Sequence, residues 1–247
     1  MSWFENACAE RVVPWRWGVT LFNRAFPKVY MLNFVRVEGA PADLNFDELV
    51  AEADALHDKA GLDHRGIVIE HADLGAALAP AFRDSGWEVS TLVVMAHRGG
   101  RELGETKGDV RELTPGELRA FRAHSYSVGP SARDPETVGQ MMDKDALLAR
   151  AGGARFFGAM VDGNAVCAAD LYSDGATAQI ESVLTLEPYR KRGLGRAVVV
   201  EALRAAIDSG HDFVFLLADD EDWPKELYAR MGFESIGLCY DFLKAPD

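Results

Sequence analysis

The chain has 247 residues, 48% of them hydrophobic, and a formal net charge of -13 at pH 7. It is therefore long enough for one large domain or two small ones, and it can bury a core. So negative a chain is not expected to bind nucleic acid or an anionic membrane surface, because phosphate groups require a basic face. The sequence also lacks the run of about 18 apolar residues that a membrane-spanning helix needs.

The N-terminal residues and the cysteines bear on the compartment. No basic segment followed by an apolar one opens the chain, so no secretory signal is visible. Cys8, Cys167 and Cys239 lie far apart in the sequence and form no disulfide or metal-binding pattern. A cytoplasmic, reduced compartment is the simplest interpretation, with the cysteines buried as apolar residues. The six histidines also lack metal-ligand spacing, so no metal is expected.

The chain before residue 99 reads as alternating strands and helices. Apolar, β-branched stretches indicate strands, and apolar residues three or four apart indicate helices. The expected strands cover 15–22, 29–37, 66–70 and 89–96, and the expected helices cover 47–59 and 74–85. A polar, glycine-rich stretch follows, and there we predict a linker over 99–109.

After the linker the pattern restarts. Thr114, with Glu117 three residues further on, predicts a capped helix start. A central strand starts near Gln179 and ends by Pro188, because proline cannot donate to a sheet ladder. Other helices are expected over 114–124, 135–151 and around Tyr228. Other strands are expected over 110–113, 155–161, 165–172, 213–217 and 235–243.

A basic loop follows the central strand and opens a helix. It places four cations within seven residues of this acidic chain: Arg190, Lys191, Arg192 and Arg196. The first N–H groups of a helix have no partner within the helix and carry partial positive charge. Because Gly193 and Gly195 lack Cβ atoms, an anion can approach the backbone closely. The stretch predicts a phosphate-binding cradle, with a solvated basic helix start as the alternative.

Two common phosphate loops do not fit this stretch. The Gly-Lys-Ser/Thr ending of a Walker loop is missing, and Val198 replaces the third glycine of a dinucleotide fingerprint. What does match is Arg-x-x-Gly-x-Gly over 190–195, with a second signature, LYARMGF, over 227–233. Together they resemble the GNAT (GCN5-related N-acetyltransferase) superfamily, whose acetyl-CoA motif lies on such a strand, loop and helix. Glu221 stands where that family often has a CoA-contacting asparagine.

The resemblance implies an α/β fold, the GNAT fold, in two tandem copies whose mixed, mostly antiparallel sheets are flanked by helices. It also implies N-acetyltransferase activity in which a primary amine attacks the thioester of acetyl-CoA directly. The backbone of Val183, Leu184 and Thr185 would bind the pantetheine arm of coenzyme A. The pyrophosphate would lie on the loop and helix start, which comprise Arg190, Lys191, Arg192, Gly193, Leu194, Gly195 and Arg196.

Two residues are the catalytic candidates. By the resemblance, Tyr228 matches the family tyrosine that protonates the leaving thiolate; its alternative is a packed aromatic side chain. A glutamate near the position of Glu181 is a general base in several family members. Strand alternation would place Glu181 and Val183 on one face of the sheet. The alternatives for Glu181 are a structural hydrogen-bond acceptor or an acid that only binds a cationic substrate.

A shift of 146 positions, without gaps, places the first half of the chain on the second. Residues 33–39, 66–73 and 82–88 then fall on 179–185, 212–219 and 228–234. We interpret this as an internal duplication, with chance similarity between two α/β halves as the alternative. The expected domains are a degenerate copy over 1–98, the linker, and a complete catalytic copy over 110–247.

The first copy is not expected to bind coenzyme A, because its counterpart of the basic loop has no glycine, no cation and two acids. We expect it to pack against the second copy or to form one wall of the substrate cleft.

The expected function is an acyl-CoA-dependent N-acetyltransferase that uses acetyl-CoA as cosubstrate and no metal. Its acceptor is an amine on a small molecule or a peptide, and the negative net charge favours a cationic one. The chain is expected to be a monomer or a homodimer without nucleic acid or membrane partners. The alternatives are a GNAT-fold sensor or regulator that binds acyl-CoA without catalysis, and an interaction protein with a vestigial site.

Overall fold

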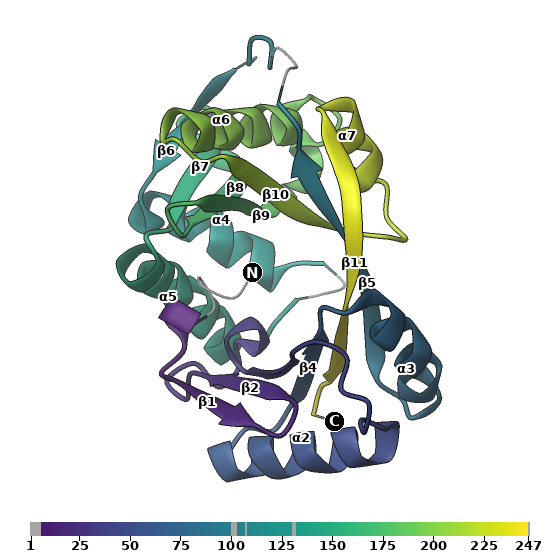
Figure 1. The fold of residues 1–247 in the computed structure, drawn as a ribbon. Helices are drawn as coiled ribbons and strands as arrows, with labels where there is room; N and C mark the ends of the chain where they lie inside the picture. The colour runs from purple at the N-terminus through teal and green to yellow at the C-terminus, as the bar shows by residue number, and fades with distance from the viewer. Residues whose placement is uncertain (1–5, 100–102, 107, 130–131, 247) are drawn as a thin grey trace.

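The computed structural model describes residues 6–99, 103–106, 108–129 and 132–246. They form a mixed α/β structure in which helices flank a sheet (Figure 1), as the sequence predicts. The strands are β1 (Arg11–Trp15), β2 (Gly18–Phe22), β3 (Phe34–Val37), β4 (Arg65–Ile69), β5 (Glu88–His97), β6 (Asp109–Leu113), β7 (Arg155–Val161), β8 (Asn164–Ser173), β9 (Thr177–Thr185), β10 (Phe213–Asp219) and β11 (Phe233–Lys244). The helices are α2 (Phe46–Ala60), α3 (Ala72–Asp84), α4 (Pro115–Ser127), α5 (Pro135–Gly152), α6 (Leu194–Asp208) and α7 (Pro224–Arg230), with short 3-10 helices η1 (Tyr30–Leu32) and η2 (Glu187–Tyr189).

Two helices of the second half begin with side-chain caps, of which the sequence predicts the first. Thr114 and Glu117 form a reciprocal capping box at the start of α4. Asp134 accepts hydrogen bonds from the first N–H groups of α5. Among the helices within the described residues, none combines the length and the apolarity needed to cross a bilayer.

The largest differences from the expected elements lie before residue 38. The strand expected over 15–22 is a hairpin, in which β1 and β2 pair on either side of a two-residue turn. Of the strand expected over 29–37, only the end is a strand, and the part before it is η1.

The side chain of Asn33 explains the shape of this segment. Its Oδ1 accepts the N–H of Asn23 at 2.8 Å, and its Nδ2 donates to the carbonyl groups of Phe26 at 2.8 Å and Val29 at 3.1 Å. These bonds offer the backbone partners that compete with a sheet ladder. The segment therefore folds back on itself before β3 begins.

One sheet runs through both halves of the described chain, in the order β1-β2-β3-β4-β11-β5-β10-β9-β8-β7-β6. Two of its ten neighbouring pairs, β3–β4 and β9–β10, are parallel, and the others are antiparallel. β5 lies between β11 and β10, while β11 lies between β4 and β5. Each half thus inserts its last strand into the other, and Figure 1 shows β5 and β11 side by side along the middle of the molecule.

The expected domain boundaries at residues 98 and 110 remain a prediction. Residues 1–5, 100–102, 107, 130–131 and 247, which fall within the expected domains and linker, lie outside the described residues. The described part of the linker packs on α6, where Arg196 donates to the carbonyl of Leu103 at 3.1 Å and Thr106 donates to Glu201 at 2.6 Å.

Under the 146-residue shift, β3, α2, β4 and β5 overlap β9, α6, β10 and β11. The internal duplication remains our interpretation, which this correspondence of elements supports.

Three hydrophobic clusters follow from the two faces of the sheet. One contains the buried face of α6 together with Ile180 of β9, and a second contains side chains of α2 and α3 together with Ile67 of β4. The third lies under α4 and α5, and it includes Ala168 of β8 and also Leu32 of η1. The η1 segment of the first half is therefore part of the core that α4 and α5 cover.

His57, on α2, makes the first half sensitive to acid. Its imidazole is fully buried, with Nδ1 2.8 Å from the carbonyl of Ala53, and its Nε2 accepts the N–H of Gly66 at 3.2 Å. Burial lowers the pKa of His57 to about 4. A lowered pKa means that the folded state binds fewer protons than the unfolded state below pH 6.5, so stability is lost as the pH falls through that range.

We expect the His57→Gln variant to lose less of its unfolding free energy between pH 7 and pH 5 than the wild type, by about 2 kcal/mol. Urea unfolding at the two pH values measures this difference. The matched control is His124→Gln, which changes an exposed histidine and should keep the wild-type pH dependence. Equal pH dependence in wild type and His57→Gln would contradict the assignment.

Candidate active site

The central strand β9 carries a bulge next to its open edge. Its pairing with β8 shifts register between Ala168 and Asp170, and Ser182 has a positive φ of 54°, which is uncommon for a residue other than glycine. Its parallel pairing with β10 ends at the pair Ile180–Leu216, although both strands continue beyond it. The backbone of 183–185 thus lies where the two strands have separated.

The bulge also corrects one prediction. Glu181 and Val183 do not share a face of the sheet: Glu181 lines a cavity on one side, while Val183 packs into the α6 core on the other. The extra residue at Ser182 shifts the alternation by one position, so the simple period of two fails there. Leu184 returns to the side of α4 and α5, and the Thr185 hydroxyl donates to the sulfur of Cys167 at 3.0 Å.

The basic loop lies directly after this open edge. Gly193, with φ of 82°, precedes α6 without a side-chain cap, and no acidic residue stands in the first turn of the helix. Arg190 Nε donates to the carbonyl of Thr185 at 3.2 Å, and Arg192 donates to that of Pro188 at 2.9 Å. These bonds hold the guanidinium groups at the mouth of the strand opening.

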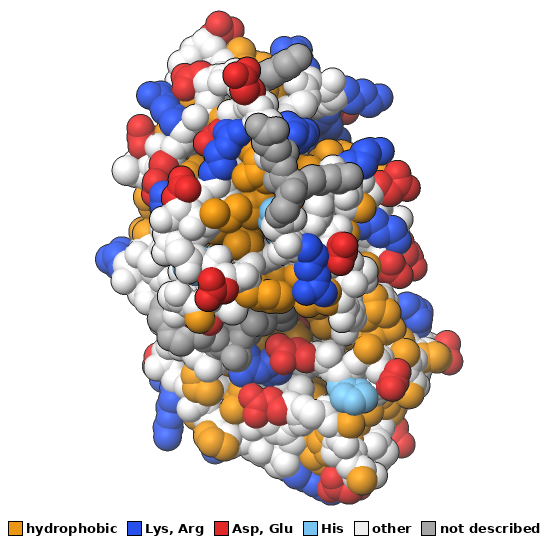
Figure 2. Space-filling view, turned by 45° about the horizontal axis from the view of Figure 1, so that its top comes forward, with side chains coloured by type: hydrophobic (Ala, Val, Ile, Leu, Met, Phe, Trp, Pro, Cys, Tyr) orange, Lys and Arg blue, Asp and Glu red, His pale blue; other side chains and the backbone are white. Residues whose placement is uncertain are grey.

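The cations of the loop are available to a ligand. Arg190, Lys191, Arg192 and Arg196 are exposed, and within the described residues none of them pairs with a carboxylate. Figure 2 shows Lys and Arg side chains gathered over the upper part of the molecule, which contains α6. The uncapped N–H groups and the unpaired cations together can bind a phosphate.

The equivalent helix start in the first half is closed to an anion. Asn45 caps α2 with its own side chain, and Asp47 and Glu48 lie in the first turn. Arg16 already pairs with Asp43 and Glu48, at 2.7 Å each. That the first half binds no pyrophosphate stays a prediction, which this arrangement supports.

Glu181 is a half-buried carboxylate at the edge of the cavity. Gln179 Nε2 donates to its Oε1 at 2.6 Å. Burial raises the pKa of Glu181 to about 7, and the negative charge of Asp170 adds to this effect. A carboxylate with such a pKa can accept a proton near neutral pH.

Tyr228, on α7, has 6% of its surface exposed and meets the ring of Phe233 edge-on, with the centroids 6.2 Å apart. Burial, followed by the negative charge of Glu181, raises the pKa of Tyr228 to about 12. The phenol therefore stays protonated and can act as a proton donor.

A buried ionic network lies behind Glu181, and the sequence did not point to it. Arg122 of α4, with 2% of its surface exposed, pairs with Asp170 of β8 and with Asp145 of α5, the latter at 3.3 Å. Lys144 also contacts Asp145 at 3.4 Å, and Tyr172 donates to Asp170 at 3.2 Å. The one available signal was an aspartate within an otherwise apolar strand. No group of three or more possible metal ligands occurs among the residues that the structure describes.

A cavity of about 260 Å³ lies between the two halves on the side of the sheet that Glu181 faces. The second half contributes Tyr172, Gln179 and Glu181 to it. The apolar walls come from η1, from strands of the first half and from β11. Their residues are Met31, Leu32, Phe34, Val68, Leu92 and Leu243. The cavity is therefore complete only when both halves are present.

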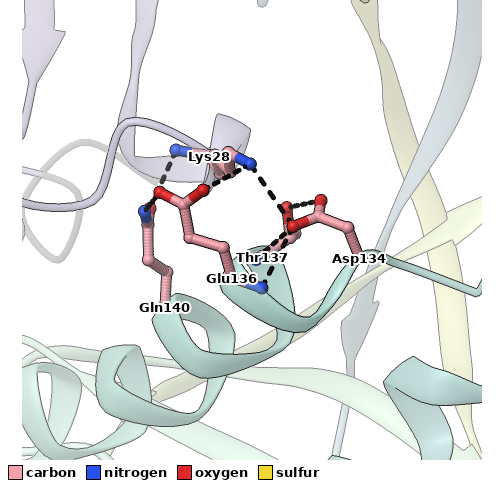
Figure 3. A network of polar contacts seen from close by, with 5 residues as sticks. All are labelled: Lys28, Asp134, Glu136, Thr137 and Gln140. Carbon is pink, nitrogen blue, oxygen red and sulfur yellow. Dashed lines mark hydrogen bonds and ion pairs between the residues drawn. The ribbon is translucent and has the colours of Figure 1, made fainter.

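Lys28 fixes the segment that forms one wall of this cavity (Figure 3). Its Nζ pairs with Asp134 at 3.3 Å and Glu136 at 2.8 Å, both at the start of α5. Its backbone N–H donates to Gln140 Oε1 at 2.9 Å. These contacts tie η1, two residues further on, to the second half.

Comparisons with known proteins agree with the fold. The sequence model of the Acetyltransferase (GNAT) family matches residues 118–233. Among solved structures, a functionally unknown conserved protein from Staphylococcus epidermidis ATCC 12228 has a TM-score of 0.76 at 16% identity, covering 97% of this chain and 95% of that one. A search of the curated proteins gave no significant match.

Two further solved structures belong to GNAT proteins. A GCN5-related N-acetyltransferase from Kribbella flavida has a TM-score of 0.58 at 19% identity, covering 97% of this chain and 91% of that one. A tandem GNAT protein from the clavulanic acid biosynthesis pathway has a TM-score of 0.58 at 15% identity, with coverages of 85% and 74%. At such identities these structures indicate a shared fold.

Proposed function

Through residues 118–233 the chain belongs to the GNAT superfamily of acetyltransferases, and from this premise we propose that it transfers the acetyl group of acetyl-CoA to a primary amine. One observation carries the proposal. Cations without a carboxylate partner and an uncapped helix start follow directly after the open edge of β9, and β9 also carries Glu181. The pyrophosphate of coenzyme A fits the basic loop and helix start, and the thioester-bearing arm fits the open edge of β9.

The proposed roles follow from position and charge. The loop from Arg190 to Arg196 holds the pyrophosphate, and the backbone of 183–185 binds the pantetheine arm. The amine nitrogen attacks the thioester carbonyl carbon and passes its proton to Glu181. The carbon–sulfur bond then breaks, and Tyr228 gives its phenolic proton to the departing sulfur. The proton held by Glu181 returns to Tyr228 through solvent, which restores both groups.

Thiol release with a panel of primary amines tests this proposal. With acetyl-CoA at saturation, we expect at least one amine to raise the rate of free thiol formation well above the amine-free rate. The corresponding alcohols serve as matched controls, because they lack the nucleophilic nitrogen and should leave the rate unchanged. Tight acetyl-CoA binding with no thiol release for any amine would instead favour the sensor or regulator.

A further inference from the structure

The cavity next to Glu181 has an unusual balance of charge. Most of its lining is apolar, and its charged groups are two carboxylates, those of Glu181 and Asp241. Within the described residues that line it, no Lys, Arg or His offsets them. An apolar cavity whose lining carries two acids and no base is complementary to a ligand that has both apolar surface and positive charge.

The second acid that lines the cavity is Asp241. It belongs to β11, and its carboxylate takes part in no hydrogen bond or ion pair with any described residue. The apolar surroundings of Asp241 and the nearby charge of Glu88 raise its pKa to about 6, so the group is ionised at neutral pH. A solvent-accessible, unpartnered carboxylate inside an apolar cavity can bind an ammonium group.

The two carboxylates lie well apart. β10 and β5 separate β9 from β11 in the sheet, so Glu181 and Asp241 are three strand spacings apart. With neighbouring strands about 4.8 Å apart, this gives a lateral separation of roughly 14 Å between their backbones. The two residues are also offset along the strands, because Ile180 aligns with Ser235 through Leu216 and Met95. A single ammonium group cannot contact both acids, whereas an elongated ligand with a cation at each end can.

The size of the cavity limits the ligand to a small molecule. Its volume of about 260 Å³ lies just below the range of about 300–1,000 Å³ that is usual for pockets of small ligands. The rest of the lining is mostly apolar. The lining residues on the two intervening strands, Leu92 of β5 and Leu217 of β10, suit a hydrocarbon spacer rather than a polar backbone.

We propose that the acceptor is an elongated diamine with an apolar spacer, whose reacting amine lies at Glu181 and whose second ammonium group is bound by Asp241. The identity of the reacting end rests on the function proposed above, while the binding of a dication across the cavity does not. The first half of the chain and β11 would then determine which amine is accepted.

The test compares diaminooctane with octylamine, which has the same spacer and lacks the second amine. In calorimetric titrations at pH 7.5 we expect diaminooctane to bind the wild type about tenfold more tightly, a typical gain for one accessible charge pair. In Asp241→Asn the ratio should fall to within about threefold, and in Asp241→Glu it should be kept. The charge-matched control is Glu234→Gln, on the same strand but paired with Arg98 outside the cavity lining.

Binding and turnover separate the two proposals. A diamine preference that depends on Asp241, without thiol release, would support the cavity assignment and contradict acetyl transfer. Thiol release with equal kcat/KM and equal affinity for the two amines would overturn the diamine proposal alone. Three other results would also overturn it. They are the same loss of preference in Glu234→Gln, a preference that is unchanged in Asp241→Asn, and no binding of either amine. Unchanged acetyl-CoA affinity shows that each variant is folded.

Discussion

Replacing Arg190 and Arg192 together by alanine is expected to weaken acetyl-CoA binding about 100-fold. Each guanidinium is exposed and without a carboxylate partner among the described residues, so both are free to bind the pyrophosphate. A hydrogen bond between charged groups contributes about 1.5 kcal/mol or more, and two such bonds give roughly 3 kcal/mol, or two orders of magnitude in Kd. Calorimetric titration of acetyl-CoA into wild type and variant measures the loss.

The matched control is Arg83→Ala with Arg150→Ala, which removes two exposed arginines from α3 and α5. This variant changes the net charge equally but leaves the loop intact, so it should keep the wild-type Kd. The loss in the loop variant should also shrink as salt is added, because exposed charges are screened. An equal loss in both variants would point to a general effect of net charge, and an unchanged Kd in the loop variant would contradict the cradle.

Replacing Glu181 by glutamine is expected to lower kcat by between about 100-fold and 10,000-fold, the usual contribution of a general base. Glutamine keeps the shape and can still accept the bond from Gln179, but it cannot take a proton. With the wild type, kcat/KM should rise with pH and level off above about 7, where Glu181 is ionised. This rise of kcat/KM with pH should be absent in the variant. A steady-state pH profile with the best amine of the panel measures both effects.

The same substitution, although it lowers activity, should raise the stability of the fold above neutral pH. Because the pKa of Glu181 is raised in the fold, the folded state binds more protons than the unfolded state, and stability falls as the pH rises from about 4.5 to 7. Glu181→Gln should therefore unfold at higher urea than the wild type at pH 8. The control Glu187→Gln removes an exposed acid near the loop and should change neither property. Normal activity of Glu181→Gln would leave Glu181 as a substrate-binding or structural acid.

The exchange of β5 and β11 gives the first half a part in the site without a coenzyme loop of its own. Asn45 and two acids close its helix start, while Phe34 and Val68 face the shared cavity. This arrangement supports the view that the first half forms a wall of the substrate cleft.

Local sequence features predicted what local interactions decide. The capping box of Thr114 and Glu117 and the helix start after Gly193 form between residues that are neighbours in the chain. The basic loop was recognisable for the same reason: its glycines and cations act within a single turn of backbone. These features were enough to predict the family, and the resemblance supplied the expected fold.

The tertiary structure decided what depends on residues far apart in sequence. The bulge at Ser182 reverses the face of Val183, and it arises from pairing with β8 rather than from a local signal. The buried pair of Arg122 and Asp170 joins residues 48 positions apart. Nor could the periodicity of β5 or β11 reveal that each is inserted into the other half, since apolar strands of one period fit several neighbours equally well.

The sequence by itself thus predicted the strand-loop-helix at Arg190 to Arg196 and the positions of most helices and strands, because short-range contacts define both. Its two motifs predicted the family. Only the tertiary structure decided that Glu181 and Asp241 line one cavity. They are sixty residues apart in the chain, and they share that cavity because β11 crosses into the first half of the chain. A cavity between halves is a property of packing, which no single segment encodes.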